Sequence, residues 1–268
     1  MNELEVAIAE WHRVREEIAP EDEERLWKKL RLEWNYNSNH IEGNTLTYDE
    51  TVLLLIHGHT AGSHPIRDYE EMKAHDLSIE LVRSLAVADP PLTEADIREL
   101  NRKLLKEPFW KSAETPDGGV TRKWIEPGKY KTQPNHVRTS TGELHRFAEP
   151  EETPARMEEW VRRLRSDLGR TDCPLPEFLA ESHWSFVNIH PFDDGNGRTA
   201  RLITNYILLR KDLLPMVIRS EDRDRYLSTL RRADAGNGQP LAELMLAQRD
   251  RPSVKARTRI ESRPHSVQ

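Results

Sequence analysis

The spacing of apolar residues restricts the fold of this chain more than any other feature, because they recur every three to four positions over most of its 268 residues. Such spacing places them on one face of an α-helix. Residues 153–169 are the clearest case: a Thr-Pro pair opens the segment, apolar residues follow at helical spacing, and Gly169 can close it. Capping boxes at Thr47–Glu50 and Thr93–Asp96 predict two further helix starts.

The rest of the chain follows the same pattern, with one exception. Residues 67–88 and 221–234 also predict helices, whereas residues 112–129 carry the Gly and Pro residues of a loop. Residues 129–147 lack helical spacing, and their Thr, Val and Tyr residues with a Thr-Gly pair predict a short β-hairpin. The sequence as a whole predicts an all-α fold with one hairpin.

Charge and cysteine content narrow the class of protein. The formal net charge is −6, which argues against a nucleic-acid-binding protein, because such domains are normally basic. Cys173 is the only cysteine, so an internal disulfide and a thiolate zinc cluster are excluded and a reducing compartment is indicated. The N-terminal residues contain no apolar signal region, and no apolar run approaches the ~18 residues that span a bilayer. We therefore expect a soluble, cytoplasmic protein without a nucleic-acid or membrane partner.

One short segment, residues 190–201 with the sequence HPFDDGNGRTAR, combines the residue types of a catalytic site. Apolar residues at helical spacing precede and follow it, so it is predicted to be a turn between two helices. Gly195-Asn196-Gly197 would lie at the N-terminus of the second helix, where backbone N–H groups are unpaired and the dipole is positive. Because glycine lets the backbone approach a ligand, this tripeptide predicts a phosphate-binding nest, although no Walker-type lysine follows it.

The charged residues of this signature segment fit a polyphosphate. Arg198 and Arg201 are three residues apart and share one helix face, from which both can bind phosphate oxygens bidentately. Asp194 can hold Mg²⁺, which usually takes one or two carboxylates beside phosphate oxygens, while Asp193 is expected to point to solvent or to cap the loop. His190 can accept a proton at cellular pH. Together these residues predict phosphoryl or nucleotidyl transfer from a nucleoside triphosphate.

The segment resembles the signature of the Fic (filamentation induced by cAMP) family, His-x-Phe-x-Asp/Glu-Gly-Asn-Gly-Arg-x-x-Arg. Every specified position is present: His190, Phe192, Asp194, Gly195, Asn196, Gly197, Arg198 and Arg201. The resemblance extends from about Asn35 to about Met245 and implies an all-α Fic fold, a helical bundle with a short β-hairpin flap. It also implies an enzyme, a protein adenylyltransferase that transfers AMP from ATP to a Ser, Thr or Tyr hydroxyl of a target protein.

The resemblance further implies a role for each residue of the signature segment. His190 would deprotonate the target hydroxyl, and Asp194 would hold Mg²⁺ on the α- and β-phosphates of ATP. Residues 195–197 would cradle the phosphates, and Arg198 and Arg201 would hold their β/γ end.

Residues outside the segment receive roles in the same way. The hairpin at 129–147 is similar to the family's flap, which would bind the target segment by strand addition. Tyr226 and Asp234 match the region that borders the adenine. Within the segment, Phe192 is expected to anchor the loop in the core. His183 lies seven residues before His190 and is expected, from its position alone, to be a packed core residue.

A second, earlier stretch, SNHIEGN at residues 38–44, resembles the inhibitory motif of regulated Fic proteins, Ser/Thr-x-x-x-Glu-Gly/Asn, on Ser38, Glu42 and Gly43. Ser38 and Glu42 would lie one turn apart on a short helix at about residues 35–45. The resemblance implies an autoinhibited enzyme of the class with an N-terminal inhibitory helix. Glu42 would pair with Arg201 and withhold it from the γ-phosphate.

These features suggest a domain organisation and leave several functions open. Residues 1–110 would be an N-terminal helical region that carries the inhibitory helix, residues 111–250 the catalytic core, and residues 251–268 a basic, flexible tail. The alternatives are removal of AMP by the same site, with Glu42 positioning a water, and transfer from another donor such as UTP or a phosphocholine carrier. A non-enzymatic alternative is a nucleotide-sensing interaction module. Self-modification and a homodimer are compatible with each enzymatic reading.

Overall fold

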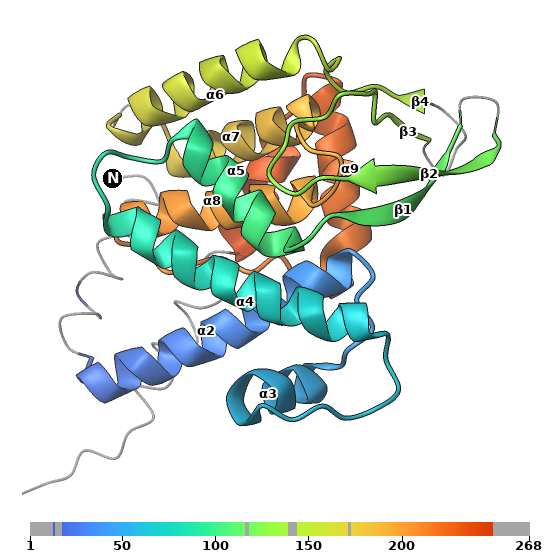
Figure 1. Cartoon of the computed structure of the whole chain (residues 1–268). Coiled ribbons are helices and arrows are strands. Elements are labelled where there is room, and N and C mark those ends of the chain that lie inside the picture. The colour runs from blue at the N-terminus through green and yellow to red at the C-terminus, as the bar shows by residue number, and fades with distance from the viewer. Residues whose placement is uncertain (1–12, 14–17, 116–117, 139–143, 171–172, 249–268) are drawn as a thin grey trace, which may run out of the picture.

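The computed structural model of the chain describes residue 13 and residues 18–115, 118–138, 144–170 and 173–248. Its helices are α2 (Pro20–Ile41), α3 (Tyr48–His57), α4 (Ile66–Val87), α5 (Glu94–Leu105), α6 (Thr153–Leu168), α7 (Leu175–Ile189), α8 (Asn196–Arg210), a 3-10 turn at Ser220–Asp222, and α9 (Arg223–Asp234). Two antiparallel hairpins pair β1 (Phe109–Glu114) with β2 (Val120–Ile125) and β3 (Val137–Arg138) with β4 (Leu144–His145) (Figure 1). The mostly helical architecture confirms the predicted all-α class.

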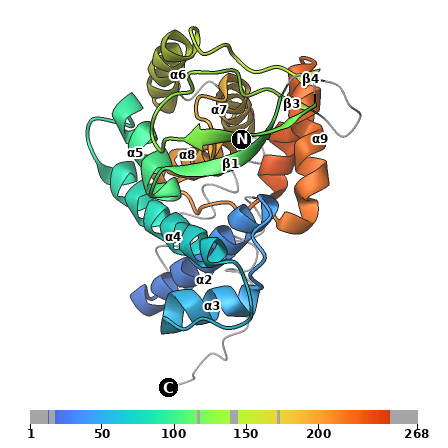
Figure 2. The same ribbon diagram turned by 45° about the vertical axis from the view of Figure 1, so that its right-hand side comes forward.

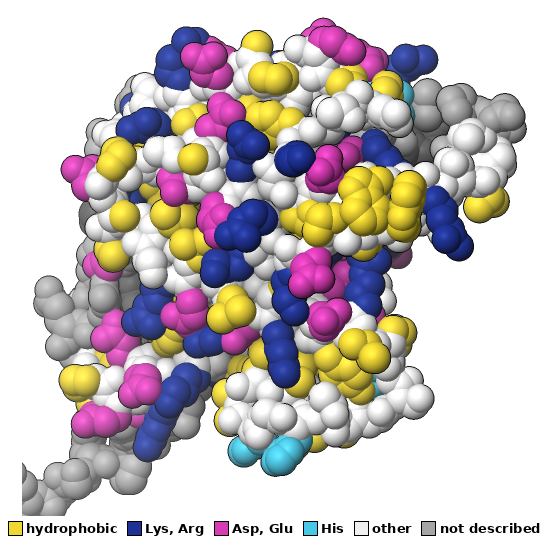
Figure 3. All heavy atoms as spheres, viewed as in Figure 1, with side chains coloured by type: hydrophobic (Ala, Val, Ile, Leu, Met, Phe, Trp, Pro, Cys, Tyr) yellow, Lys and Arg dark blue, Asp and Glu magenta, His cyan; other side chains and the backbone are white. Residues whose placement is uncertain are grey.

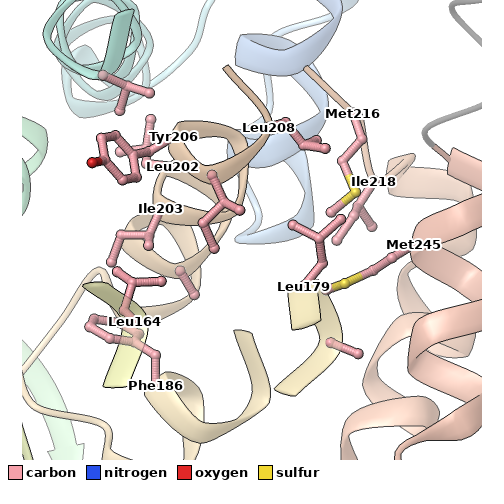
Figure 4. Close-up of a cluster of buried hydrophobic side chains, with 14 of the residues drawn as sticks. Leu164, Leu179, Phe186, Leu202, Ile203, Tyr206, Leu208, Met216, Ile218 and Met245 are labelled. Atoms are coloured by element: carbon pink, nitrogen blue, oxygen red, sulfur yellow. The ribbon is translucent and has the colours of Figure 1, made fainter. Parts of the chain in front are cut away.

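Helix α8 forms the centre of the core, and most of its side chains are buried. Figure 4 shows side chains from α6, α7, α8 and the segments after them pointing toward one another: Leu164, Leu179, Phe186, Leu202, Ile203, Tyr206, Leu208, Met216, Ile218 and Met245. The fully buried hydroxyl of Tyr206 accepts a hydrogen bond from the backbone N–H of Leu92 at 2.9 Å, so a polar group in this core is satisfied. A helix surrounded in this way holds its N-terminus in a fixed position.

The N-terminal helices pack on this central helix. Helix α4 contacts α8 and α5, and α2 contacts both α4 and α8, while α3 lies on the outside of α2 and α4 (Figures 1 and 2). Trp34 and Ile41 of α2 belong to the same hydrophobic cluster as Leu202 of α8. The division at residue 110 stays a prediction, and the predicted tail at 251–268 lies outside the described residues.

Helix starts agree with their sequence signals. Both capping boxes are present, with Thr47 and Thr93 each accepting from the backbone N–H three residues later. Helix α6 begins at Thr153 as expected, although its N-cap is Glu152. Among the described helices, none combines the length and the apolar character needed to cross a membrane.

The larger hairpin, β1–β2, was missed, because residues 112–129 were expected to be a loop. Alternation explains how it forms: Trp110 pairs with Trp124 on one face, and Lys111 pairs with Lys123 on the other. The two indole rings contact each other with centroids 5.1 Å apart, and Trp110 is 60% exposed, so they form an apolar patch over the hairpin (Figure 3). The hairpin expected at 129–147 is present only as the short β3–β4 pair, and residues 139–143 lie outside the described part of the chain.

Candidate active site

The signature segment joins α7 to α8, as the sequence predicts, and two residues with positive φ shape the turn. His190 ends α7 at φ 52°, and Gly195 precedes α8 at φ 77°. A Cβ at Gly195 would lie 3.0 Å from the Asn101 amide nitrogen, so glycine is needed here for space as well as for conformation. The Asn196 side chain bonds both the N–H and the carbonyl of Phe192, at 2.9 and 2.7 Å. Asn196 therefore shapes the loop with its side chain and leaves its backbone to the nest.

The imidazole of His190 is mostly buried and held in one orientation. Its Nδ1 lies 3.2 Å from the Val187 carbonyl, to which it donates, so Nε2 is the nitrogen left to accept a proton. The Phe147 ring stacks on it with centroids 3.8 Å apart and an interplanar angle of 16°. Burial lowers the pKa of His190 to about 3, against an ordinary value of 6.5.

Two residues between the hairpins hold the loop around His190, and sequence analysis identified neither. Asn135 Nδ2 donates to the carbonyls of His190 and Phe192, at 3.1 and 2.8 Å. The buried ammonium of Lys131 donates to the Ile189 carbonyl at 3.0 Å and to Asn135 Oδ1 at 2.9 Å. These bonds offset the backbone strain of a non-glycine residue with positive φ.

The two acids of the segment both have basic partners. Asp194 Oδ1 accepts a hydrogen bond from Lys111 Nζ at 2.9 Å, and Arg67 Nη2 lies 3.6 Å from Oδ2. Burial works to raise the pKa of Asp194, but Lys111 and then Arg198 outweigh it and lower that pKa. The expectation that Asp193 points to solvent is wrong: its side chain is largely buried, with Oδ1 2.6 Å from Lys123 Nζ.

Asp194 has one carboxylate oxygen that is open to a hard cation. Its Oδ2 is buried and accepts no hydrogen bond from the described residues. Asn101 Nδ2 fixes the Asp194 carbonyl at 2.9 Å, and Asn101 Oδ1 accepts from the Gly128 N–H at 2.9 Å. A carboxylate with an unused oxygen, beside a predicted phosphate nest, matches the usual protein contribution to a Mg²⁺ site.

Arg198 is buried and lacks a full set of partners. It is 3% exposed, and neither Nε nor Nη1 makes a hydrogen bond with any described residue. The nearest acid is Glu71 of α4, whose Oε2 lies 3.5 Å from Nη1. A buried guanidinium with free donors at a helix N-terminus is a strong anion site.

Arg201 is instead occupied by the end of α2. Its Nε donates to Ser38 Oγ at 2.9 Å, and its Nη2 donates to the Ser38 carbonyl at 2.9 Å and to Glu42 Oε1 at 2.7 Å. The Glu42 oxygen lies 2.5 Å from the position that a Cβ on Gly197 would take, so the carboxylate lies directly against the nest. Burial works to raise the pKa of Glu42, but Arg201 and Arg198 outweigh it and lower that pKa.

The helix expected at about residues 35–45 is longer than predicted, since Ser38 and Glu42 lie at the C-terminal end of the 22-residue α2. Glu42 is the C-cap, and Gly43 follows it at φ 96°. Both residues therefore lie at the point where the helix backbone ends and turns away.

Tyr226 and Asp234, predicted to border the adenine, lie at different depths. Tyr226 is buried, and its hydroxyl lies 2.7 Å from His183 Nε2. Asp234 is exposed and accepts from the Trp184 indole N–H at 2.8 Å. His183 is buried, as expected for a core residue.

Sequence comparison relates this arrangement to known proteins. The profile of the Fic/DOC family matches residues 91–208, which include the signature segment. The chain is 29% identical over 222 residues to protein adenylyltransferase Fic of Drosophila yakuba, an alignment that covers 82% of this chain and 41% of the relative. It is 31% identical over 217 residues to protein adenylyltransferase Fic of Nematostella vectensis, covering 81% of this chain and 46% of the relative. The chain thus spans less than half the length of these curated relatives.

Solved structures match over more of their length. A Fic domain-containing signalling protein from Bacteroides thetaiotaomicron superposes with a TM-score of 0.86 and 36% identity, covering 99% of both chains. Fic-1 from C. elegans superposes with a TM-score of 0.73 and 22% identity, covering 97% of this chain and 71% of the other. The second likeness supports the fold alone.

Proposed function

The chain belongs to the Fic/DOC family, and from this premise we propose that it is a protein adenylyltransferase that transfers AMP from ATP to a hydroxyl of a target protein. The observation that carries the proposal is the meeting of His190, Asp194 and the nest of residues 195–197 in one turn between α7 and α8. A base, a carboxylate for a cation and a phosphate cradle are the parts that this reaction needs.

In the proposed reaction, the oxygen of the target hydroxyl attacks the α-phosphorus of ATP. The bond from that phosphorus to the α–β bridging oxygen breaks, and pyrophosphate leaves. His190 Nε2 accepts the hydroxyl proton, because Nδ1 is committed to the Val187 carbonyl. The low pKa of His190 keeps its imidazole neutral at cellular pH, and it also makes this nitrogen a weaker proton acceptor than an ordinary imidazole.

Asp194, with its unused buried Oδ2, would hold Mg²⁺. Bound there, the cation would neutralise charge on the phosphates and the leaving pyrophosphate. The backbone N–H groups of the nest and the free donors of Arg198 would bind the phosphate oxygens. The β3–β4 hairpin would bind the target segment by strand addition. Tyr226 and Asp234 would border the adenine of ATP.

We further propose that Glu42 inhibits this reaction. Its carboxylate takes a donor of Arg201 and lies against Gly197, where a phosphate would otherwise bind. A nucleotide that met this carboxylate would experience like-charge repulsion and would bind with its α-phosphate displaced. A misplacement of ~1 Å can cost about 10²-fold in rate.

The test is label transfer from α-³²P-ATP to the protein itself or to proteins of its host extract. Glu42→Gly is expected to raise transfer by at least about tenfold over wild type, and Glu42→Gly with His190→Ala to abolish it. Equal activity of wild type and Glu42→Gly would remove Glu42 as the inhibitor. Loss of AMP removal from a modified target in Glu42→Gly would favour the reverse reaction instead.

A further inference from the structure

The β1–β2 hairpin presents a pair of lysines to the two acids of the signature segment. Lys111 and Lys123 are direct cross-strand partners, an arrangement that is destabilising when the charges are left uncompensated. Each has its own acid: Lys123 Nζ lies 2.6 Å from Asp193, and Lys111 Nζ 2.9 Å from Asp194. The alternation that turns both tryptophans outward therefore turns both lysines toward the catalytic loop.

The two ion pairs differ in how much of the lysine side chain is exposed to solvent. The Lys123 side chain is 20% exposed and pairs with Asp193, a residue that has no role in the proposed transfer reaction. The Lys111 side chain is 46% exposed and ends on the carboxylate proposed to hold the cation. Because the Lys111 ammonium keeps contact with solvent, a divalent cation, which carries twice its charge, could displace it from the largely buried Asp194 carboxylate.

A displaced ammonium would stay beside the phosphate site, because Lys111 lies in the middle of a hydrogen-bonded strand. Arg201 is bonded to Glu42 and Arg198 keeps free donors, so the Lys111 ammonium would add a further positive charge beside them. Lysine binds phosphate as a mobile point charge and does not need the fixed geometry of a guanidinium.

We propose that Lys111 is a further polyphosphate-binding residue, which pairs with Asp194 in the nucleotide-free protein and moves to the β- or γ-phosphate when a divalent cation takes that carboxylate. The proposal rests on the proposed function and deepens it. It makes β1 part of the nucleotide site and selects nucleotides that carry a β-phosphate over nucleoside monophosphates.

The first test is calorimetric binding of α,β-methylene-ATP with Mg²⁺, in the Glu42→Gly protein. This analogue cannot be cleaved at the bond that the reaction breaks. Lys111→Met is expected to weaken its binding about tenfold, the equivalent of one charge-assisted contact, while AMP binding changes less than about twofold. Lys123→Met is the matched control: it removes the partner lysine of the same hairpin and is expected to change neither affinity.

The second test is Mn²⁺ binding followed by electron paramagnetic resonance without nucleotide. Lys111→Met is expected to tighten Mn²⁺ binding about threefold or more, because the competing ammonium is gone. Lys123→Met should again behave like the parent.

Several results would overturn the proposal. They are unchanged analogue binding in Lys111→Met, an equal loss for AMP, the same loss in Lys123→Met, or unchanged Mn²⁺ affinity. An equal loss in both lysine variants would mean that the hairpin contacts are structural. If the Glu42→Gly protein binds AMP and Mn²⁺ but not the analogue, both the proposed function and the Lys111 proposal fail. If the Glu42→Gly protein binds the analogue and only the Lys111→Met variant departs from expectation, the Lys111 proposal fails and the proposed function stands.

Discussion

At the residue scale, the surroundings of His190 determine how the proposed base should respond to pH. Its burial lowers its pKa to about 3, so it should remain neutral throughout the mildly acidic range. We predict that the transfer rate of Glu42→Gly stays flat from pH 8 to about pH 5. An imidazole with an ordinary pKa would lose half of its base form near pH 6.5. Initial rates of label transfer across this range measure the difference.

The Phe147 ring provides the control, because it stacks on the imidazole and excludes water from it. In the Glu42→Gly background, Phe147→Ala should raise the pH at which the transfer rate falls on the acid side, toward pH 6. Identical profiles in the two proteins, or a limb near pH 6.5 in both, would show that the stacked arrangement is absent from the active state.

At the element scale, the segment between the hairpins supports the catalytic loop through Asn135. Its amide holds the carbonyls of His190 and Phe192. Asn135→Ala should lower the transfer rate of Glu42→Gly about 10–100-fold, because His190 loses its fixed position. Affinity for α,β-methylene-ATP should change little, since the nest and the arginines are untouched.

Asn188→Ala is a suitable comparison for this prediction, because Asn188 lies on α7 near the same loop and its amide bonds only weakly to Asp234, at 3.5 Å. Turnover and analogue affinity of both variants would be measured together. A parallel fall in rate and affinity in Asn135→Ala would indicate general loosening of the site.

Elements that depend on local signals were predictable from the sequence. The capping boxes of α3 and α5, the extent of α6 and the glycine turn before α8 all follow from residues within a few positions of one another. The β1–β2 hairpin is not predictable in the same way, because its strands mix tryptophan with lysine and arginine and the Gly and Pro residues between them are typical of a loop. The alternation of tryptophan and lysine along the two strands is recognisable only when the structure shows which face of the hairpin each residue lies on.

Contacts between distant residues were the part that sequence could not supply. Asn101 and Asn135 carry no periodic or motif signal, yet they bond the backbone of a loop 55 to 93 residues away. The pairing of Glu42 with Arg201 was expected only because two family motifs are present, since neither residue's own neighbours indicate the other. Polar residues of this kind acquire a partner only when the helices pack.

At the scale of the whole molecule, buried neutral histidines link stability to pH. Burial lowers the pKa of His183 and of His190 to about 3, from 6.5. The unfolded chain takes up these protons as the pH falls through 6.5, whereas the folded protein takes them up only near pH 3, so stability falls across that window. Between pH 7 and 5 the loss is about 2 kcal/mol for each such histidine.

Urea unfolding at pH 7 and pH 5 tests this prediction, because carboxylates contribute mainly below this range. His183→Gln should reduce the pH-dependent part of the loss, whatever its effect at pH 7. His59→Gln, which changes an exposed histidine, should leave it unchanged. The same pH dependence in all three proteins would contradict the buried neutral state of His183.

The way α2 is anchored has a consequence for how the proposed inhibition can be released. Leu30, Trp34 and Ile41 are buried in α2, and withdrawing the helix would expose them at a cost of about 1.5–3 kcal/mol each. Glu42 follows the last helical residue, its side chain is 38% exposed, and Gly43 gives the backbone freedom to turn. An activating ligand therefore has to redirect one side chain at residues 42–43, and the amides of α2 should keep their protection from hydrogen exchange when it does.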